Sequence, residues 1–254
     1  MIVIDAGNTL ITCAVFDGEN IAQVHRVTTQ ECLQRKTFLE NLTELHTLSG
    51  QDVVISSVRR QIKELIIEEI SKETGRRPFV VDVSTDMGIT LLYETPETLG
   101  VDRIICAAAG FHLYSKGESP LIVIDLGTAT TMECISENGE YLGGVIAPGL
   151  MSSYEGLLMR APELPRRELE PGGPLIGRST TQCILSGVIH GHASLVEGMT
   201  EKMARSMGSS PGVLITGGFS ALVKPLLPET YVLDQDLILK GLRIICLLSR
   251  GNKC

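Results

Sequence analysis

The chain has 254 residues, 43% of them hydrophobic and 20% charged, which excludes disorder and suffices for one large α/β domain or two smaller ones. A formal net charge of −8 argues against nucleic acid or anionic lipid as the main partner, because both require a basic surface. The N-terminus lacks a secretory signal pattern, no apolar run approaches the roughly 20 residues that span a bilayer, and seven scattered cysteines without a CxxC pair indicate reduced, mostly buried thiols. We therefore expect a cytoplasmic protein whose partners are small molecules, with no nucleic acid and no membrane.

The first half of the chain predicts three strands, a helix, a strand, a helix and a strand. The apolar run at 2–5 suits a buried central strand, and Asp17-Gly18-Glu19-Asn20 suits a hairpin turn. The second helix is predicted from apolar residues at near-helical spacing between 62 and 70. The remaining elements are strands at 10–16, 21–27, 53–55 and 79–81 and a helix over 31–48.

The second half repeats this order. Residues 122–125 read Ile-Val-Ile-Asp, letter for letter the same as residues 2–5, and a Gly-containing turn follows in both places. Such a repeat predicts two copies of one unit, 1–115 and 116–254. Strands are predicted at 131–136, 141–147 and 213–215, helices at 150–160 and 180–207, an apolar helix at 104–114, and a surface loop or lid at 162–177 with four prolines.

Each copy ends its first strand with an aspartate and a glycine turn: Asp5-Ala6-Gly7-Asn8-Thr9 and Asp125-Leu126-Gly127-Thr128. Glycine lets the backbone approach an anion closely, and the N–H groups of such a turn form an anion-binding concavity. A carboxylate does not bind phosphate directly, so its expected role is to hold a cation that bridges to phosphate oxygens. A single Asp-x-Gly turn is more often a plain turn after a core strand, but two in matching positions predict a nucleotide cleft.

A third glycine turn, Gly217-Gly218, follows the predicted strand at 213–215. The threefold arrangement resembles the actin-like, hexokinase-like phosphotransferase superfamily. That resemblance implies an α/β fold of duplicated actin-like (ribonuclease H-like) units, each a mixed five-stranded sheet with flanking helices, and a nucleotide cleft between them.

Further segments narrow the resemblance. They are Gly100-Val101-Asp102-Arg103, the run Gly-Gly-Val-Ile-Ala-Pro-Gly at 143–149, Ile-Gly-Arg-Ser-Thr at 176–180, and Asp-Leu-Ile-Leu-Lys-Gly-Leu at 236–242. With the two Asp-x-Gly turns, their order and spacing over nearly the whole chain resemble the type III pantothenate kinases.

This resemblance implies ATP-dependent phosphorylation of pantothenate to 4′-phosphopantothenate, the first step of coenzyme A synthesis, with Mg²⁺ and a monovalent cation (K⁺ or NH₄⁺) and in a homodimer. It implies that Asp102 is the proton acceptor and that Asp125 ligates the monovalent cation. The implied ATP contacts are Thr128 and the loop Asp5, Ala6, Gly7, Asn8, Thr9, Leu10, Ile11 and Thr12. The implied pantothenate contacts are Tyr93, Gly100, Val101, Asp102, Arg103 and Thr180.

Alternatives stay open at this point. Asp102 and Arg103 also suit a helix N-cap with a surface ion pair, and Tyr93 suits simple packing. Leu10 departs from the family, which often has Asn or Arg at this position. If that side chain helps to hold phosphate in the family, ATP affinity or the reaction rate would differ in this protein. A nucleotide or polyphosphate hydrolase and a non-catalytic regulator are the other function classes for this scaffold. His190-Gly191-His192 lacks the ligand pattern of a zinc site.

Overall fold

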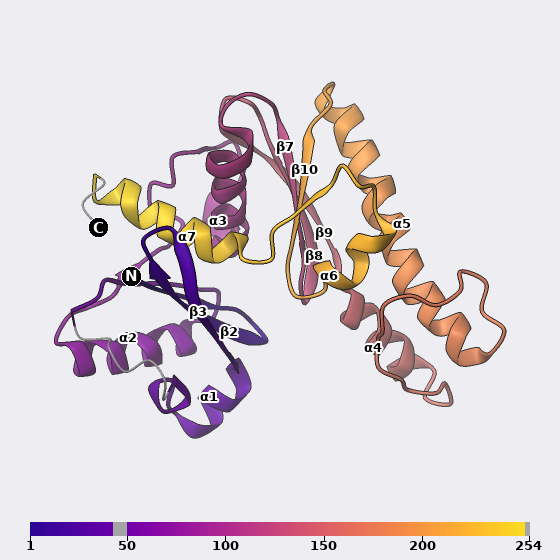
Figure 1. Ribbon diagram of the computed structural model, residues 1–254, viewed down its shortest axis with the longest axis horizontal. Helices are drawn as coiled ribbons and strands as arrows, with labels where there is room; N and C mark the ends of the chain where they lie inside the picture. The colour runs from indigo at the N-terminus through magenta and orange to yellow at the C-terminus, as the bar shows by residue number, and fades with distance from the viewer. Residues whose placement is uncertain (43–49, 252–254) are drawn as a thin grey trace. The chain divides into compact units, whose positions relative to one another are not determined.

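The computed structural model describes residues 1–42 and 50–251 (Figure 1). Two compact units are described separately: unit 1 is Met1–Ala109 with Leu237–Cys254, and unit 2 is Gly110–Asp236. The predicted repeat boundary between 115 and 116 stays a prediction, because compactness does not test where a duplication was joined. None of the described helices combines the length and the apolar composition that crossing a bilayer requires.

Unit 1 contains a mixed five-stranded sheet, as predicted. Its strands are β1 (Ile2–Ala6), β2 (Leu10–Asp17), β3 (Asn20–Thr28), β4 (Val53–Ser57) and β5 (Phe79–Val80), in the spatial order β3-β2-β1-β4-β5. The first three strands are antiparallel neighbours, whereas β4 and β5 continue the sheet in parallel with β1. The central position of β1 explains its continuous apolar run, because Ile2, Val3 and Ile4 are buried on both faces.

Helices α1 (Thr29–Arg35) and α2 (Arg60–Thr74) lie side by side against this sheet (Figure 1). Ile62, Ile66 and Ile70 of α2 pack onto the face that carries Ile2 and Ile4, which confirms the predicted helical spacing.

The predicted helix over 31–48 is too long. α1 ends at Arg35 and is capped by Lys36, which has a left-handed backbone (φ 56°) and donates its N–H to Cys32 O; the 3-10 helix η1 (Leu39–Leu42) follows. Phe38 is fully buried, and Glu69 of α2 accepts hydrogen bonds from the N–H groups of Phe38 and Leu39 at 2.7 and 2.9 Å. Burying Phe38 beside Glu69 therefore turns the chain out of the helix, and the rest of that prediction, 43–48, lies outside the described residues.

The remaining elements of unit 1 come from both ends of its sequence. They are β6 (Thr90–Leu91), the 3-10 helix η2 (Pro96–Thr98), α3 (Val101–Gly110) and α7 (Leu237–Ser249). α3 starts three residues before the predicted helix at 104–114, and residues 111–115 continue it as a π-helix, η3 (Phe111–Ser115). α7 contacts β1 and β4 and packs closely on α3, so the C-terminal helix completes the core of unit 1.

Unit 2 has the same construction. Its strands β7 (Leu121–Leu126), β8 (Ala129–Ile135), β9 (Glu140–Pro148), β10 (Gly212–Thr216) and β11 (Val232–Leu233) run in the order β11-β10-β7-β8-β9. Its helices are α4 (Leu150–Arg160), α5 (Thr180–Met207), α6 (Ser220–Val223) and the 3-10 helix η4 (Lys224–Leu226). The bounds of α4 and α5 are those predicted, and residues 162–177 form neither helix nor strand, as expected. Ala193, Val196 and Met203 of α5 pack against the sheet.

The internal repeat is confirmed by topology and register. Replacing β1 to β5 by β7 to β11 in chain order reproduces the spatial order of the sheet. In both units the aspartate one residue before the end of the central strand pairs in register with the neighbouring parallel strand, Asp5 with Ser56 and Asp125 with Thr216. The predicted α/β fold of duplicated units is therefore present.

We predict that Gly241→Ala destabilises the protein. A Cβ at Gly241 would lie 2.9 Å from Ala109 Cβ and from Ile105 Cγ2 and 3.0 Å from the backbone oxygen of Ile105, so α7 would have to move off α3. Overpacking of this kind costs about 1–3 kcal/mol. The matched control is Gly198→Ala in α5, where a Cβ meets nothing within 4 Å and the helix gains about 0.5–1 kcal/mol. Chemical denaturation measures both, and equal unfolding free energies for the two variants would contradict the packing.

Candidate functional site

The first Asp-Gly turn lies at the carboxyl end of β1. Asp5 is partly buried and accepts a 2.7 Å hydrogen bond from Ser56 Oγ on the parallel neighbour β4. Gly7 N donates to Leu10 O at 2.9 Å, and a Cβ at Gly7 would lie 3.1 Å from that oxygen, so the turn is tight and favours glycine. The carboxylate is thus held beside a turn whose tip is exposed.

The start of α1 anchors this turn. Thr29 is fully buried, donates from its hydroxyl to Gly7 O at 2.9 Å, and donates its backbone N–H to Thr9 O at 2.9 Å. Asn8, Thr9 and Leu10 remain exposed, whereas the side chain of Ile11 lies in the core. Of the predicted ATP loop 5–12, the tip is therefore the most exposed part, whereas Asp5 and Thr12 are partly buried.

The second Asp-Gly turn is built in the same way at the end of β7. Gly127 N donates to Ala129 O at 3.1 Å, and a Cβ at Gly127 would lie 3.3 Å from Asp125 Oδ1. Thr128 is exposed at the tip. Its backbone oxygen accepts hydrogen bonds from Gly149 N at 3.2 Å and Ser152 Oγ at 2.6 Å, which tie the turn to the start of α4.

The Gly217-Gly218 turn meets the second Asp-Gly turn directly. β10 and β7 are parallel, so their carboxyl ends share one edge of the sheet. Gly217 has φ +95°, and its α-carbon lies so close to Asp125 Oδ1 and the backbone of Leu126 that a Cβ would overlap both. Phe219 N donates to Leu126 O at 2.9 Å. The structure thus brings together two of the three predicted turns within unit 2.

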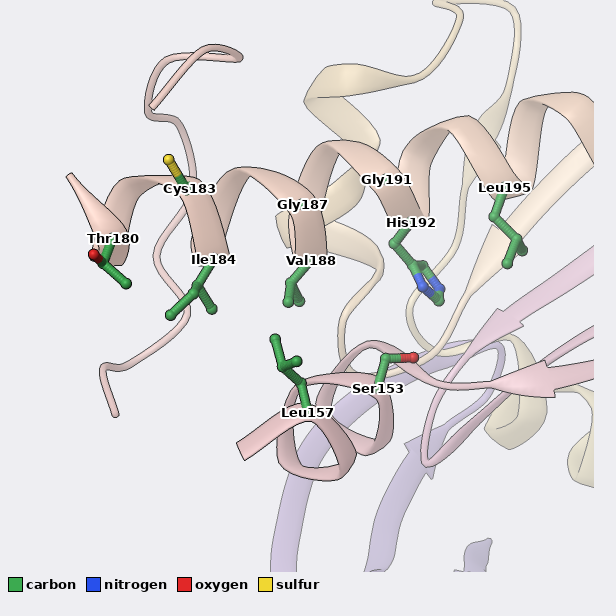
Figure 2. A pocket seen from close by; sticks show the side chains of 10 residues that line it. All are labelled: Ser153, Leu157, Thr180, Cys183, Ile184, Gly187, Val188, Gly191, His192 and Leu195. Atoms are coloured by element: carbon green, nitrogen blue, oxygen red, sulfur yellow. The ribbon is translucent and has the colours of Figure 1, made fainter. Parts of the chain in front are cut away.

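A pocket of about 570 Å³ lies between α4 and α5 (Figure 2). Thr180, predicted to contact pantothenate, is exposed and lines it at the first residue of α5. Deeper along α5, the buried imidazole of His192 is hydrogen-bonded through Nε2 to Thr130 Oγ1 at 2.8 Å. Burial lowers the pKa of His192, so the neutral ring is favoured. His192 thereby ties α5 to the strand that leaves the second turn.

Asp102 and Arg103 lie in the first turn of α3. Asp102 Oδ1 accepts the N–H of Arg103 at 2.9 Å, and a Cβ at Gly100 would lie 2.5 Å from the same oxygen. The side chain of Arg103 is only 9% exposed, so it is buried rather than free on the surface. Glycine at position 100 therefore leaves room for the carboxylate of Asp102.

The predicted site residues divide between the two units. Asp5 to Thr12, Tyr93 and Gly100 to Arg103 belong to unit 1, whereas Asp125, Thr128 and Thr180 belong to unit 2. Tyr93 is partly buried in the segment between β6 and η2. Sequence reasoning missed the partners Ser56, Thr29 and His192, because each is adjacent to its turn only through pairing or packing of distant segments.

We predict that Gly217→Ala is strongly destabilising, whereas Gly218→Ala is tolerated. At Gly217 the positive φ costs an L-residue about 1–2 kcal/mol, and the added Cβ also overlaps Asp125. At Gly218 a Cβ meets nothing within 4 Å and φ is not positive. Unfolding in denaturant should place the two variants at least about 2 kcal/mol apart. Similar losses from both would contradict the close approach of this turn to Asp125.

Comparison with known proteins agrees with this arrangement. The family model described as type III pantothenate kinase matches residues 1–202. The type III pantothenate kinase of Syntrophotalea carbinolica is 35% identical over 257 residues, covering 99% of this chain and all of that protein. The Moorella thermoacetica type III pantothenate kinase is 36% identical and covers 96% and 98% of the two chains.

A likeness in fold extends further. The crystal structure of a ROK family glucokinase from Streptomyces griseus in complex with glucose and AMPPNP matches with a TM-score of 0.55 at 15% identity, covering 98% of this chain and 99% of that one. At that identity the match concerns the actin-like and sugar-kinase fold alone. Taken with the repeated Asp-Gly turns and the full-length likeness in sequence, it leads to one conclusion: this chain belongs to the type III pantothenate kinase family.

Proposed function

We propose that this protein transfers the γ-phosphoryl group of ATP to the hydroxyl of pantothenate, which yields 4′-phosphopantothenate for coenzyme A synthesis. The observation that carries the proposal is the duplicated aspartate and glycine turn in identical register, within a chain of the type III pantothenate kinase family. Phosphoryl transfer depends mainly on positioning and on neutralising charge, and turns of this kind supply both.

ATP would bind the loop 5–12 of unit 1 and Thr128 of unit 2. The exposed tip of the first loop offers the Asn8 amide and the Thr9 hydroxyl, while Thr29 holds its backbone in place. Asp5 would hold Mg²⁺ through water, since its carboxylate lies one residue before the end of β1, next to the tip. Mg²⁺ would supply charge neutralisation on the phosphates.

Pantothenate would contact Tyr93, Gly100, Val101, Asp102, Arg103 and Thr180. Asp102 is the proposed base that accepts the proton of the attacking hydroxyl, because its carboxylate stands at the start of a helix over a glycine. A guanidinium such as that of Arg103 suits the substrate carboxylate through two parallel hydrogen bonds. Its burial supports a specific role, since an arginine is seldom buried without partners.

Asp125 would ligate K⁺ or NH₄⁺. Within residues 1–42 and 50–251, no group of three or more His, Cys, Asp or Glu side chains stands together as a metal centre. A monovalent ion at Asp125 would therefore also take backbone carbonyls and water, which are the ligands that K⁺ accepts. The close glycine turns around Asp125, at Gly127 and Gly217, place backbone within reach of such an ion.

The protein would act in the cytoplasm as a homodimer. Support for a second copy comes from large apolar side chains that are exposed on α4 and on the loop before α5. These are Leu157, Met159, Leu175 and Ile176, with exposed fractions of 41, 75, 67 and 81%. Large apolar side chains that are this exposed would be covered by a second copy if they lie in an interface.

We predict that Asp102→Asn lowers kcat by roughly 10²–10⁴-fold if the carboxylate is the base. Asparagine keeps the shape of the side chain and loses its basicity, so the fold and ATP binding should be unchanged. Glu73→Gln, an exposed carboxylate on α2, is the matched control and should behave as the parent protein. Turnover of ATP and pantothenate by a coupled assay measures the effect, and a normal kcat in Asp102→Asn would remove this role.

We further predict that activity with ATP, Mg²⁺ and pantothenate falls roughly 5-fold or more when K⁺ is replaced by Na⁺ at constant ionic strength. The reason is that a site formed by Asp125 and backbone oxygens suits the larger ion. Product analysis with and without pantothenate provides the control. Consumption of ATP that does not depend on pantothenate would favour the hydrolase alternative, and equal rates in K⁺ and Na⁺ would reject the cation site.

A further inference from the structure

A second pocket, of about 600 Å³, opens at the first Asp-Gly turn within unit 1. Most of the residues that line it carry a polar group, and Leu33 is the single apolar side chain among the described residues that form it. The others offer amides, hydroxyls and one guanidinium: Asn8, Thr9, Thr28, Gln30, Gln34 and Arg59. A polar pocket with one cation suits an anionic ligand, and two of its residues belong to the proposed ATP loop.

Arg59 reaches this pocket because of the parallel pairing of β4 with β1. Ala6 and Ser57 are in register at the ends of these strands, and Val58 N donates to Ala6 O at 3.4 Å. Ser57 Oγ accepts the N–H of Arg59 at 3.1 Å and lies 3.1 Å from Ala6 O. The backbone of Arg59 is therefore fixed beside the turn that follows Asp5.

The side chain of Arg59 is available for a ligand. It occupies the N-cap position of α2 but makes no capping hydrogen bond, and it forms no ion pair with a residue in the described part of the chain. The next residue differs: Arg60 is bound to Glu64 at 2.7 Å and is 86% exposed. Arg59, by contrast, is partly buried in the pocket lining.

The N-terminal end of α2 adds positive charge beside Arg59. The first turn of α2 contains no acidic residue, so the partial positive charge of its N-terminus adds to that of the guanidinium. The turn itself contributes only neutral donors, since Leu10 at its tip has no polar group. Neutral donors bind phosphate less strongly than a guanidinium, which can make two parallel hydrogen bonds to it.

We propose that Arg59 binds the phosphate tail of the nucleotide and is a specificity-determining residue for triphosphates. It supplies the cation that the turn 7–10 lacks, from the neighbouring strand end. The identity of the ligand as ATP rests on the proposed function. The affinity of the pocket for polyphosphate does not depend on that function.

The test compares Arg59→Gln, Arg59→Lys and the matched control Arg60→Gln in the full chain. Isothermal titration with ATP, tripolyphosphate and adenosine measures binding, and steady-state kinetics measures KM. Arg59→Gln should weaken binding of ATP and tripolyphosphate by roughly 10–100-fold, the range expected for charged hydrogen bonds, and leave adenosine binding unchanged. Arg59→Lys should lie in between, and Arg60→Gln should match the parent protein. In Arg59→Gln the KM for ATP should rise, whereas kcat and the KM for pantothenate should stay within about twofold of the parent values.

Two results would overturn the proposal. Arg59→Gln could bind tripolyphosphate as tightly as the parent protein, or Arg60→Gln could lose as much affinity, which would indicate a general charge effect. Failure of the proposed function would look different. If the parent protein makes no phosphopantothenate but Arg59→Gln still binds tripolyphosphate more weakly than the parent, the anion site stands and the proposed reaction does not. If the parent protein is an active kinase and Arg59→Gln binds tripolyphosphate as tightly as the parent, the proposed function stands and the role of Arg59 is rejected.

Discussion

The parallel pairing of the first and fourth strands of each unit is the constraint on which the rest depends. It places the carboxyl ends of two strands at one sheet edge, with Asp5 beside Ser56 and Asp125 beside Thr216. A hydrogen bond of 2.7 Å from Ser56 holds the first carboxylate in place. Each glycine turn then starts from a fixed point, so the exposed donors at its tip are positioned before any ligand arrives.

The elements around each turn hold it through hydrogen bonds to the backbone oxygens of the turn. Thr29 is buried and binds the first turn through two hydrogen bonds, and the start of α4 binds the second through Gly149 and Ser152. Gly217 completes the second turn because only a residue without Cβ fits against Asp125. This construction leaves the carboxylates and the turn tips as the chemically distinctive groups, in agreement with membership of the type III pantothenate kinase family.

The two pockets differ in the residues that line them. The pocket between α4 and α5 is mainly apolar, with Ile184, Val188 and Leu195 on one side and Leu157 on the other (Figure 2). The pocket at the first turn is lined mostly by residues with a polar group and contains Arg59. An anionic tail is therefore better accommodated at the first turn, whereas the apolar pocket suits aliphatic surface.

Local patterns in the sequence were sufficient to predict the central strands, two of the helices and both Asp-Gly turns. The repeated Ile-Val-Ile-Asp runs predicted both central strands, and the helices predicted at 150–160 and 180–207 are α4 and α5 with their observed bounds. Both Asp-Gly turns were also predicted, because strand ends and glycine turns are local features. The proposed roles of Asp102, Tyr93 and Thr180 came from resemblance and stay predictions.

Only the tertiary structure shows which distant segments these elements pack against or pair with. It ended α1 at Arg35, because burying Phe38 against Glu69 outweighs helix propensity. It returned α7 to unit 1, and it set Gly217 against Asp125 and Arg59 beside the first turn. The physical reason is common to all four: strand pairing and core packing join segments that are distant in the chain, and no local period records which partner a segment will find.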